Sequence, residues 1–284
     1  MSRIRREVLD LSIDSKTMKY KVNVEQYLSI GEIADDCAKR PLIIRGYDMQ
    51  HGERYDRDFH GVDSYNEALD LMRFGYQPVV NKLTKNMQTA KHHADKRVVF
   101  ENNIHGYAPV VPLALKGVPN NMINITIKPI KFKVIDLYYD CGAVCCYSSN
   151  QMIDAGSQML STIINLEQQG YRFNLYVAAS FCDEYGVDIM LTKVKDSDKP
   201  LDIKRISFSL THSAYFRVIG FDWQGKSPVA RDLGYGRGRS LPREFRNDDT
   251  PQQIFTYMFG KNAVYCSSES IINNGMDHIT AMIK

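Results

Sequence analysis

The chain has 284 residues, of which 44% are hydrophobic and 24% charged, ordinary proportions for a folded globular protein. Its 36 basic and 33 acidic residues leave a net charge of +3, too even a balance to predict nucleic-acid binding. No run approaches the roughly 20 apolar residues of a membrane span, and the charged start lacks the apolar core of a signal peptide. We therefore expect a cytoplasmic protein with no membrane partner and with reduced cysteines.

The N-terminal region is predicted to be a small mixed α+β element. The alternating run Met18–Val24 indicates an edge strand with one solvated face. Residues 25–40 have the spacing of a short helix, which Pro41 ends. Residues 46–63 are charged and glycine-punctuated, which is typical of a surface loop, and the two histidines in it have no spacing that matches a known metal site.

A helical hairpin is predicted next. Ser64 followed three residues later by Glu67 is a capping box, and the helix that it starts ends at Gly75. Pro78 opens a second helix. The basic segment Lys91–Arg97 is interpreted as the solvated end of that helix, with phosphate binding as the alternative.

Residues 98–130 carry short apolar runs that prolines interrupt. Because proline is confined to strand edges and turns, this pattern predicts an irregular connection with two strands. We therefore divide the chain into an N-terminal region, 1–128, and an α/β domain, 129–284.

The segment Lys131–Ser180 has the pattern of strand, loop, helix and strand. VIDLYY is a nearly continuous apolar run, as expected for a strand of a parallel sheet buried on both faces. Ser148 and Gln151 form a second capping box, and the apolar spacing that follows predicts a helix up to Gly170. A helix of this length returns the chain, so FNLYVAA should pair parallel to the first strand through a right-handed crossover.

Two stretches of the C-terminal half resemble an uncharacterised family of phage-encoded proteins. They are VIDLYYDCGAVCCYSSNQMIDAGSQMLSTIINLEQQGYRFNLYV and LDIKRISFSLTHSAYFRVIGFDW, and the shorter runs DSYNEALDLMRFGY and ALKGVPNNMIN are similar as well. The resemblance covers about half of the chain and carries no established activity. It implies a von Willebrand factor A-like or Rossmann-like, mainly parallel sheet with flanking helices.

The von Willebrand factor A fold often holds a divalent cation with an Asp-x-Ser-x-Ser run after its first strand. Asp140 occupies the aspartate position, but Gly142 and Val144 stand where the serines would supply oxygen ligands. Ser148 and Ser149 come later and are better explained as part of a helix start. We therefore expect no metal and no cofactor at this position.

Ligands of parallel sheets bind beyond the carboxyl ends of the strands. That edge is predicted to collect Asp140, Asp183 and His212 in its loops, together with several cysteines that we interpret as packing residues. A Cys–His nucleophile at this edge ranks low, because no third group is placed to orient the histidine.

The most basic loop lies at Arg231–Arg246. Its candidate binding residues are Arg231, Tyr235, Arg237, Arg239, Arg243 and Arg246. Glycines let a backbone approach phosphate, arginines pair with it, and tyrosine stacks on a base. The alternative is a surface or partner-binding loop whose arginines pair with nearby acids.

These observations favour a non-enzymatic interaction or assembly protein of a phage or mobile element, which binds a partner protein through the sheet-edge loops. The alternative is a nucleic-acid-binding accessory protein that uses residues 231–246. A metal-dependent enzyme at Asp140 and Asp183 ranks last. The expected location is the host cytoplasm, with virion association as a variant.

Overall fold

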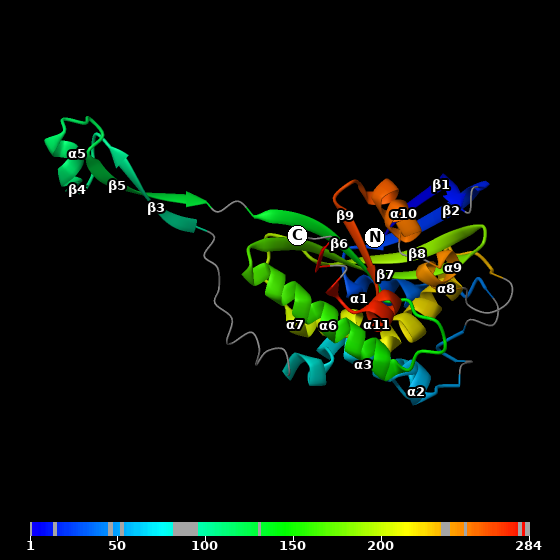
Figure 1. Cartoon of the computed structure of the whole chain (residues 1–284). Helices are drawn as coiled ribbons and strands as arrows, with labels where there is room; N and C mark the ends of the chain where they lie inside the picture. The colour runs from blue at the N-terminus through cyan, green and yellow to red at the C-terminus, as the bar shows by residue number, and fades with distance from the viewer. Residues whose placement is uncertain are drawn as a thin grey trace. The chain divides into compact units, whose positions relative to one another are not determined.

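The computed structural model describes residues 2–13, 16–44, 48–51, 54–81, 96–129, 132–233, 239–246, 249–277 and 280–281. Tertiary contacts divide the chain into two units (Figure 1). Unit 1 comprises Met1–Thr89 and Val134–Lys284, and unit 2 is the insert Ala90–Lys133. This division differs from the predicted boundary at residue 128, because the N-terminal strands share a sheet with the C-terminal ones.

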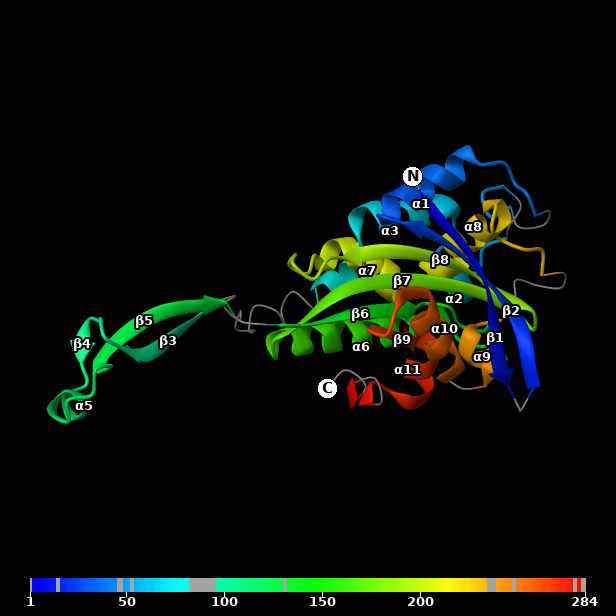
Figure 2. The ribbon, with the colours of Figure 1, turned by 90° about the horizontal axis from the view of Figure 1, so that it is seen from above.

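Unit 1 is built on a six-stranded sheet with the order β1-β2-β8-β7-β6-β9. The strands are β1 (Arg3–Ile13), β2 (Lys16–Tyr27), β6 (Lys133–Asp140), β7 (Tyr171–Asp183), β8 (Gly186–Lys195) and β9 (Ala263–Ser267). The pairs β1–β2 and β7–β8 are antiparallel, whereas β2–β8 and β6–β9 are parallel. The long strands β7 and β8 curve across the unit (Figure 2).

The predicted α/β class is confirmed, and the sheet is mixed, because the β1–β2 and β7–β8 pairs are antiparallel. The physical reason lies in the connections. Only Glu184 and Tyr185 separate β7 from β8, and so short a turn can only return the chain antiparallel.

The strand–helix–strand unit forms as predicted. Helix α6 (Ser149–Gln168) begins at the capping box of Ser148 and Gln151. Contacts between β6 and β7 advance in the same direction along both strands: the Asp136 side chain accepts a hydrogen bond from Asn174 at 2.7 Å, and the Cys141 amide donates to the Ala178 carbonyl at 2.8 Å. The two strands are therefore parallel, as the crossover requires.

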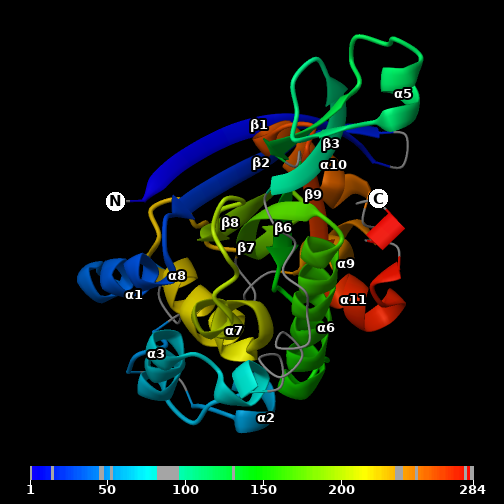
Figure 3. The ribbon, with the colours of Figure 1, turned by 90° about the vertical axis from the view of Figure 1, so that its left-hand side faces the viewer.

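Helices cover both faces of the sheet (Figures 1 and 3). The larger core lies beneath α1 (Ile30–Lys39), α2 (Arg57–His60), α3 (Tyr65–Phe74), α6, α7 (Ile203–Thr211), the π-helix η1 (Tyr215–Gly220), α8 (Phe221–Lys226) and α11 (Ser268–Asn274). The smaller core packs α9 (Leu241–Phe245) and α10 (Asp249–Phe259) on the opposite face. None of the helices in the described ranges combines the length and the apolar character that crossing a bilayer demands.

The insert has a sheet of its own, with strand order β3-β5-β4. It contains β3 (Lys96–Asn103), β4 (Ala108–Pro109), the short helix α5 (Val111–Leu115) and β5 (Met122–Pro129), and both strand pairings are antiparallel. Pro109 and Pro129 end β4 and β5, Pro112 lies in the first turn of α5, and Pro119 lies between α5 and β5. Proline is tolerated at strand ends and in turns.

Candidate functional site

The parallel strands β6 and β9 end side by side, since Asp140 and Ser267 are register partners. The loop after β6 and helix α11 after β9 both start at this edge. The Ser268 hydroxyl donates to the Gly142 carbonyl at 2.8 Å and so ties the two together. This is the edge where α/β sheets bind ligands.

Asp140 lies at the floor of this edge and is completely buried. Its carboxylate accepts hydrogen bonds from the Gly142 amide at 2.9 Å and the Tyr265 hydroxyl at 3.1 Å. Burial raises the pKa of Asp140 to about 6, and the two donors oppose that rise. Within the described ranges, no three His, Cys, Asp or Glu side chains gather as metal ligands would.

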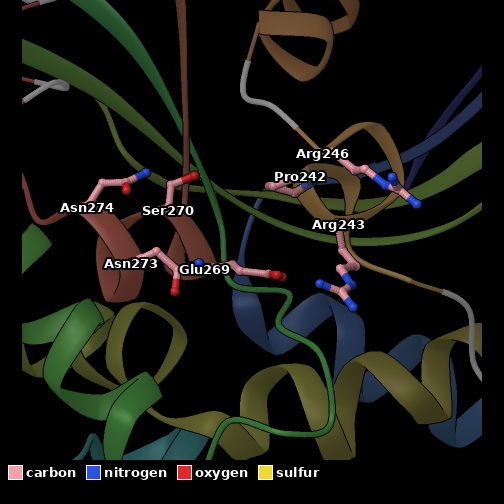
Figure 4. Close-up of a pocket in the computed structure, with 7 residues that line it drawn as sticks. All are labelled: Pro242, Arg243, Arg246, Glu269, Ser270, Asn273 and Asn274. Atoms are coloured by element: carbon pink, nitrogen blue, oxygen red, sulfur yellow. The ribbon is translucent and has the colours of Figure 1, made fainter.

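A cavity of about 220 Å³ lies beside this edge, between α9 and α11. It is lined by Pro242, Arg243, Arg246, Glu269, Ser270, Asn273 and Asn274. Figure 4 shows the Glu269 side chain extending from α11 toward α9, and Arg246 pointing away from α11. Glu269 is mostly buried and accepts a hydrogen bond from the Ser240 hydroxyl. The cavity is polar and of mixed charge.

Two arginines of the basic loop at 231–246, Arg231 and Arg239, are paired within unit 1. Arg231 forms ion pairs with Asp183 at 3.0 Å and Asp188 at 3.1 Å. Arg239 pairs through its backbone with Cys182, and its side chain contacts Glu244 at 3.2 Å. Arg231 is therefore an internal cation of unit 1.

The remaining candidates of this loop have different places. Arg243 and Arg246 line the cavity of Figure 4. Tyr235 and Arg237 lie outside the described residues.

The three predicted sheet-edge residues, Asp140, Asp183 and His212, also lie in different settings. Asp183 accepts hydrogen bonds from the Tyr185 and Gly186 amides and so closes the β7–β8 turn. His212 follows α7 and lines a different groove, which includes residues of α3 and α6. Asp140, Asp183 and His212 therefore do not form one site.

The insert carries a surface that the sequence reasoning missed. Its exposed large apolar side chains, called here the apolar surface of the insert, are Phe100, Ile104, Tyr107, Val111, Leu115 and Ile125. Among the insert residues whose burial the structure describes, 99–126 and 132–133, none is buried. The alternation of isoleucine with polar residues in β5 is the signal that predicts one apolar face, but such a pattern does not say what covers that face.

Comparison with known proteins gives one match. The family described as a domain of unknown function, DUF7192, matches residues 9–277 of the chain. No curated protein and no solved structure matches.

Proposed function

We propose that this chain, which belongs to the DUF7192 family, is a non-enzymatic interaction protein that binds a partner protein through the apolar surface of its insert. One observation carries the proposal. The insert forms a sheet with its own pairings, yet none of its residues 99–126 is buried, and six large apolar side chains are exposed.

The strands of the insert leave apolar surface in contact with water. A strand with alternating apolar and polar residues normally buries its apolar face, and each Å² removed from water contributes about 25 cal/mol. A unit as small as the insert cannot bury that surface within itself. Phe100 and Ile125 lie opposite each other across β3 and β5, and exposed apolar patches are typical of interaction sites. A partner protein supplies the burial that the insert lacks.

Charge narrows the kind of partner. Residues 90–133 contain six lysines and one arginine against two acids, so 7 − 2 gives a net charge of +5, compared with +3 for the whole chain. The preferred partner therefore combines an apolar recess with acidic side chains around it. This revises the expectation that the sheet-edge loops are the binding surface.

Nucleic acid is the second candidate, and the same net charge favours it. Two aromatic side chains of the apolar surface, Phe100 and Tyr107, are able to stack on bases. The other four are aliphatic, and aliphatic side chains gain their energy by burial in an apolar recess. Protein is therefore the better-supported partner.

The finer fold assignment belongs to the same proposal. We take the sheet of unit 1 as a mixed variant of the von Willebrand factor A arrangement, supported by the parallel β6–α6–β7 unit and by Asp140 at the end of β6. Together with that assignment we propose a phage origin for the chain. Its location would then be the host cytoplasm, with association with the virion as the variant.

The test compares three forms of the full chain as bait in lysate from its native source. They are the unchanged protein, the insert variant Phe100→Ser/Leu115→Ser, and the control Phe74→Ser. Phe74 lies in α3 of unit 1 and is 59% exposed, against 64% for Phe100. A protein captured by the first and third forms but not by the second is then purified and titrated against all three.

We expect the insert variant to bind the purified partner at least tenfold more weakly, while the control binds as the unchanged chain does. Equal binding by all three forms contradicts the proposal. Recovery of nucleic acid instead of protein, with affinity that falls steeply with salt, assigns the insert to the second candidate.

A further inference from the structure

A groove of about 340 Å³ lies in unit 1 between α2, α3, α6 and the end of α7. It shares no lining residue with the sheet-edge cavity. Side chains that matter for its chemistry are Arg57, Asp58, Glu67, Tyr76, Asn150 and His212. We call it the His212 groove.

His212 presents a hydrogen-bond donor to this groove. The side chain is only 6% exposed, and its Nδ1 accepts a hydrogen bond from the Ala214 amide at 3.2 Å. The proton of the neutral ring therefore sits on Nε2. No group in the described ranges accepts a hydrogen bond from Nε2. This nitrogen is accessible from the groove. Burial lowers the pKa of His212 to about 4, so the ring is neutral near pH 7.

Packing fixes the direction of this donor. The Tyr76 ring stands edge-on to the imidazole, with ring centroids 4.7 Å apart. Gly61 has a φ of +81°, and a Cβ there would press on the His212 ring and the Ser213 hydroxyl. The imidazole is therefore held between α2 and Tyr76 and has little freedom to turn away.

The start of α6 supplies two further donors. Ser148 caps the helix by accepting from the Gln151 amide. No group in the part of the chain that the structure describes accepts a hydrogen bond from the amides of Ser149 and Asn150, the first two helical residues, and both residues line the groove. Free amides at the start of a long helix attract anions.

Charges at the rim limit how negative a ligand can be. Arg57 is engaged by Glu67 at 2.9 Å and by Asp63 at 2.5 Å. Asp58 adds a carboxylate to the lining. The charged side chains of the lining, Arg57, Asp58 and Glu67, sum to −1. Repulsion by this charge is about twice as large for a dianion such as a phosphate monoester as for a single negative charge.

We propose that the His212 groove binds a carboxylate group, with Nε2–H of His212 donating to it together with the backbone amides of Ser149 and Asn150. The apolar side chains of Leu71, Ile153 and Tyr76 in the lining contact the apolar part of the ligand. The carboxylate comes either from a free small acid or from the C-terminus of a peptide chain. This proposal does not depend on the role of the insert.

Two substitutions at one position isolate the backbone donor. Ser149→Pro removes the amide hydrogen at the first helical position, where proline is well tolerated. Ser148 has φ −71° and ψ 162°, a conformation that suits the residue before proline. Ser149→Ala loses the same hydroxyl but keeps the amide hydrogen, so it is the matched control. His212→Asn keeps an acceptor for the Ala214 amide, and because its side chain is shorter, its own amide nitrogen does not reach the position of Nε2.

The probes are sodium acetate, an N-acetylated dipeptide with a free C-terminus, the same dipeptide as its C-terminal amide, and inorganic phosphate. Each is titrated calorimetrically into the full chain, after circular dichroism and thermal unfolding have shown that the variants are folded. If Ser149→Pro does not fold, His212→Asn against the unchanged chain carries the test.

We expect the dipeptide acid to bind and its amide to bind at least tenfold more weakly. Ser149→Pro and His212→Asn should each weaken the acid at least tenfold, and Ser149→Ala by less than twofold. Acetate binding as tightly as the dipeptide acid assigns the groove to small free acids. The proposal is overturned if the dipeptide acid and its amide bind equally, or if phosphate binds more tightly than either carboxylate. It is also overturned if Ser149→Pro and Ser149→Ala behave alike, or if neither carboxylate binds.

Discussion

Phe100 of β3 lies directly opposite Ile125 of β5, and the two side chains are 64% and 47% exposed. Opposite residues in an antiparallel pair share one face of the sheet. The pair therefore places apolar surface on a face where a core would be expected. This relationship is the structural basis for treating the insert as a binding element.

The first prediction concerns stability. Phe100→Ser should change the free energy of unfolding by less than about 0.5 kcal/mol, as is usual for exposed positions. Phe74→Ser in α3 should behave alike, because its exposure is similar. Urea unfolding of both variants measures this. A loss of several kcal/mol for Phe100→Ser alone would show that Phe100 is packed in the free protein, against the proposal.

The second prediction concerns the buried carboxylate of Glu25 in β2. It accepts hydrogen bonds from Arg40 at 2.6 and 2.9 Å, from the Trp223 indole at 2.9 Å and from the Ser227 hydroxyl at 2.6 Å. Glu25→Gln leaves Arg40 with the partly exposed Asp36 as its remaining counter-charge and should cost about 3 kcal/mol in urea unfolding.

Glu7→Gln is the control for that charge change, because the ion pair of Glu7 with Arg5 is exposed and should contribute less than about 0.5 kcal/mol. Glu25 also sets a pH dependence. Burial opposes its ionisation, but the hydrogen bonds from Arg40, Ser227 and Ser2 outweigh that effect and lower its pKa to about 2. Its stabilisation is therefore complete above pH 4.5 and disappears as the pH falls toward 2. Equal acid sensitivity of Glu25→Gln and the unchanged chain would contradict this account.

The third prediction concerns Asp140, whose pKa has the opposite shift. A carboxyl group with a raised pKa stabilises the fold most below its ordinary pKa, and that contribution is lost as the pH rises through about 6. As the pH rises from 4 to 8, the free energy of unfolding of Asp140→Asn should therefore increase by about 3 kcal/mol relative to that of the unchanged chain. Urea unfolding at both pH values measures the difference. A stability difference that stays constant with pH would show that Asp140 does not titrate in this range.

The fourth prediction uses the contact between α6 and α7. A Cβ at Gly156 would run into the Leu210 carbonyl oxygen and the Thr211 backbone. Gly156→Ala should destabilise the protein by about 1–3 kcal/mol, although alanine is the better helix former. Gly31→Ala in α1 has no neighbour to meet and should stabilise by about 0.5 kcal/mol. Thermal unfolding distinguishes the two signs, and a stable Gly156→Ala variant would mean that α6 and α7 are free to separate.

Local signals in the sequence were sufficient for the helix starts. Ser64 and Ser148 each accept a hydrogen bond from the amide three residues later, as the capping boxes predict. The parallel pairing of β6 and β7 followed from the length of the helix between them. These features depend on residues close together in the chain, which sequence patterns report well.

Pairings between distant residues were not predictable in the same way. The β2–β8 pairing joins Val22 to Val187 and brings the N-terminal strands into one sheet with the C-terminal ones. From the sequence, Arg231 is expected to be free to bind a ligand, because it stands next to a glycine-rich stretch. Its ion-pair partner Asp188 lies in β8, far from it in sequence. An alternating strand such as β5 predicts an apolar face and leaves open what lies against it. The candidate site depends on contacts of this non-local kind.

The most direct test of the partner-binding proposal is hydrogen–deuterium exchange of the intact chain, with and without the protein captured by the bait experiment. The account predicts that binding slows exchange of the amides in β3, α5 and β5, and that Phe100→Ser/Leu115→Ser abolishes this protection while Phe74→Ser preserves it. Protection confined to the sheet edge around Asp140 and Arg243, with unchanged exchange in the insert, would contradict the account.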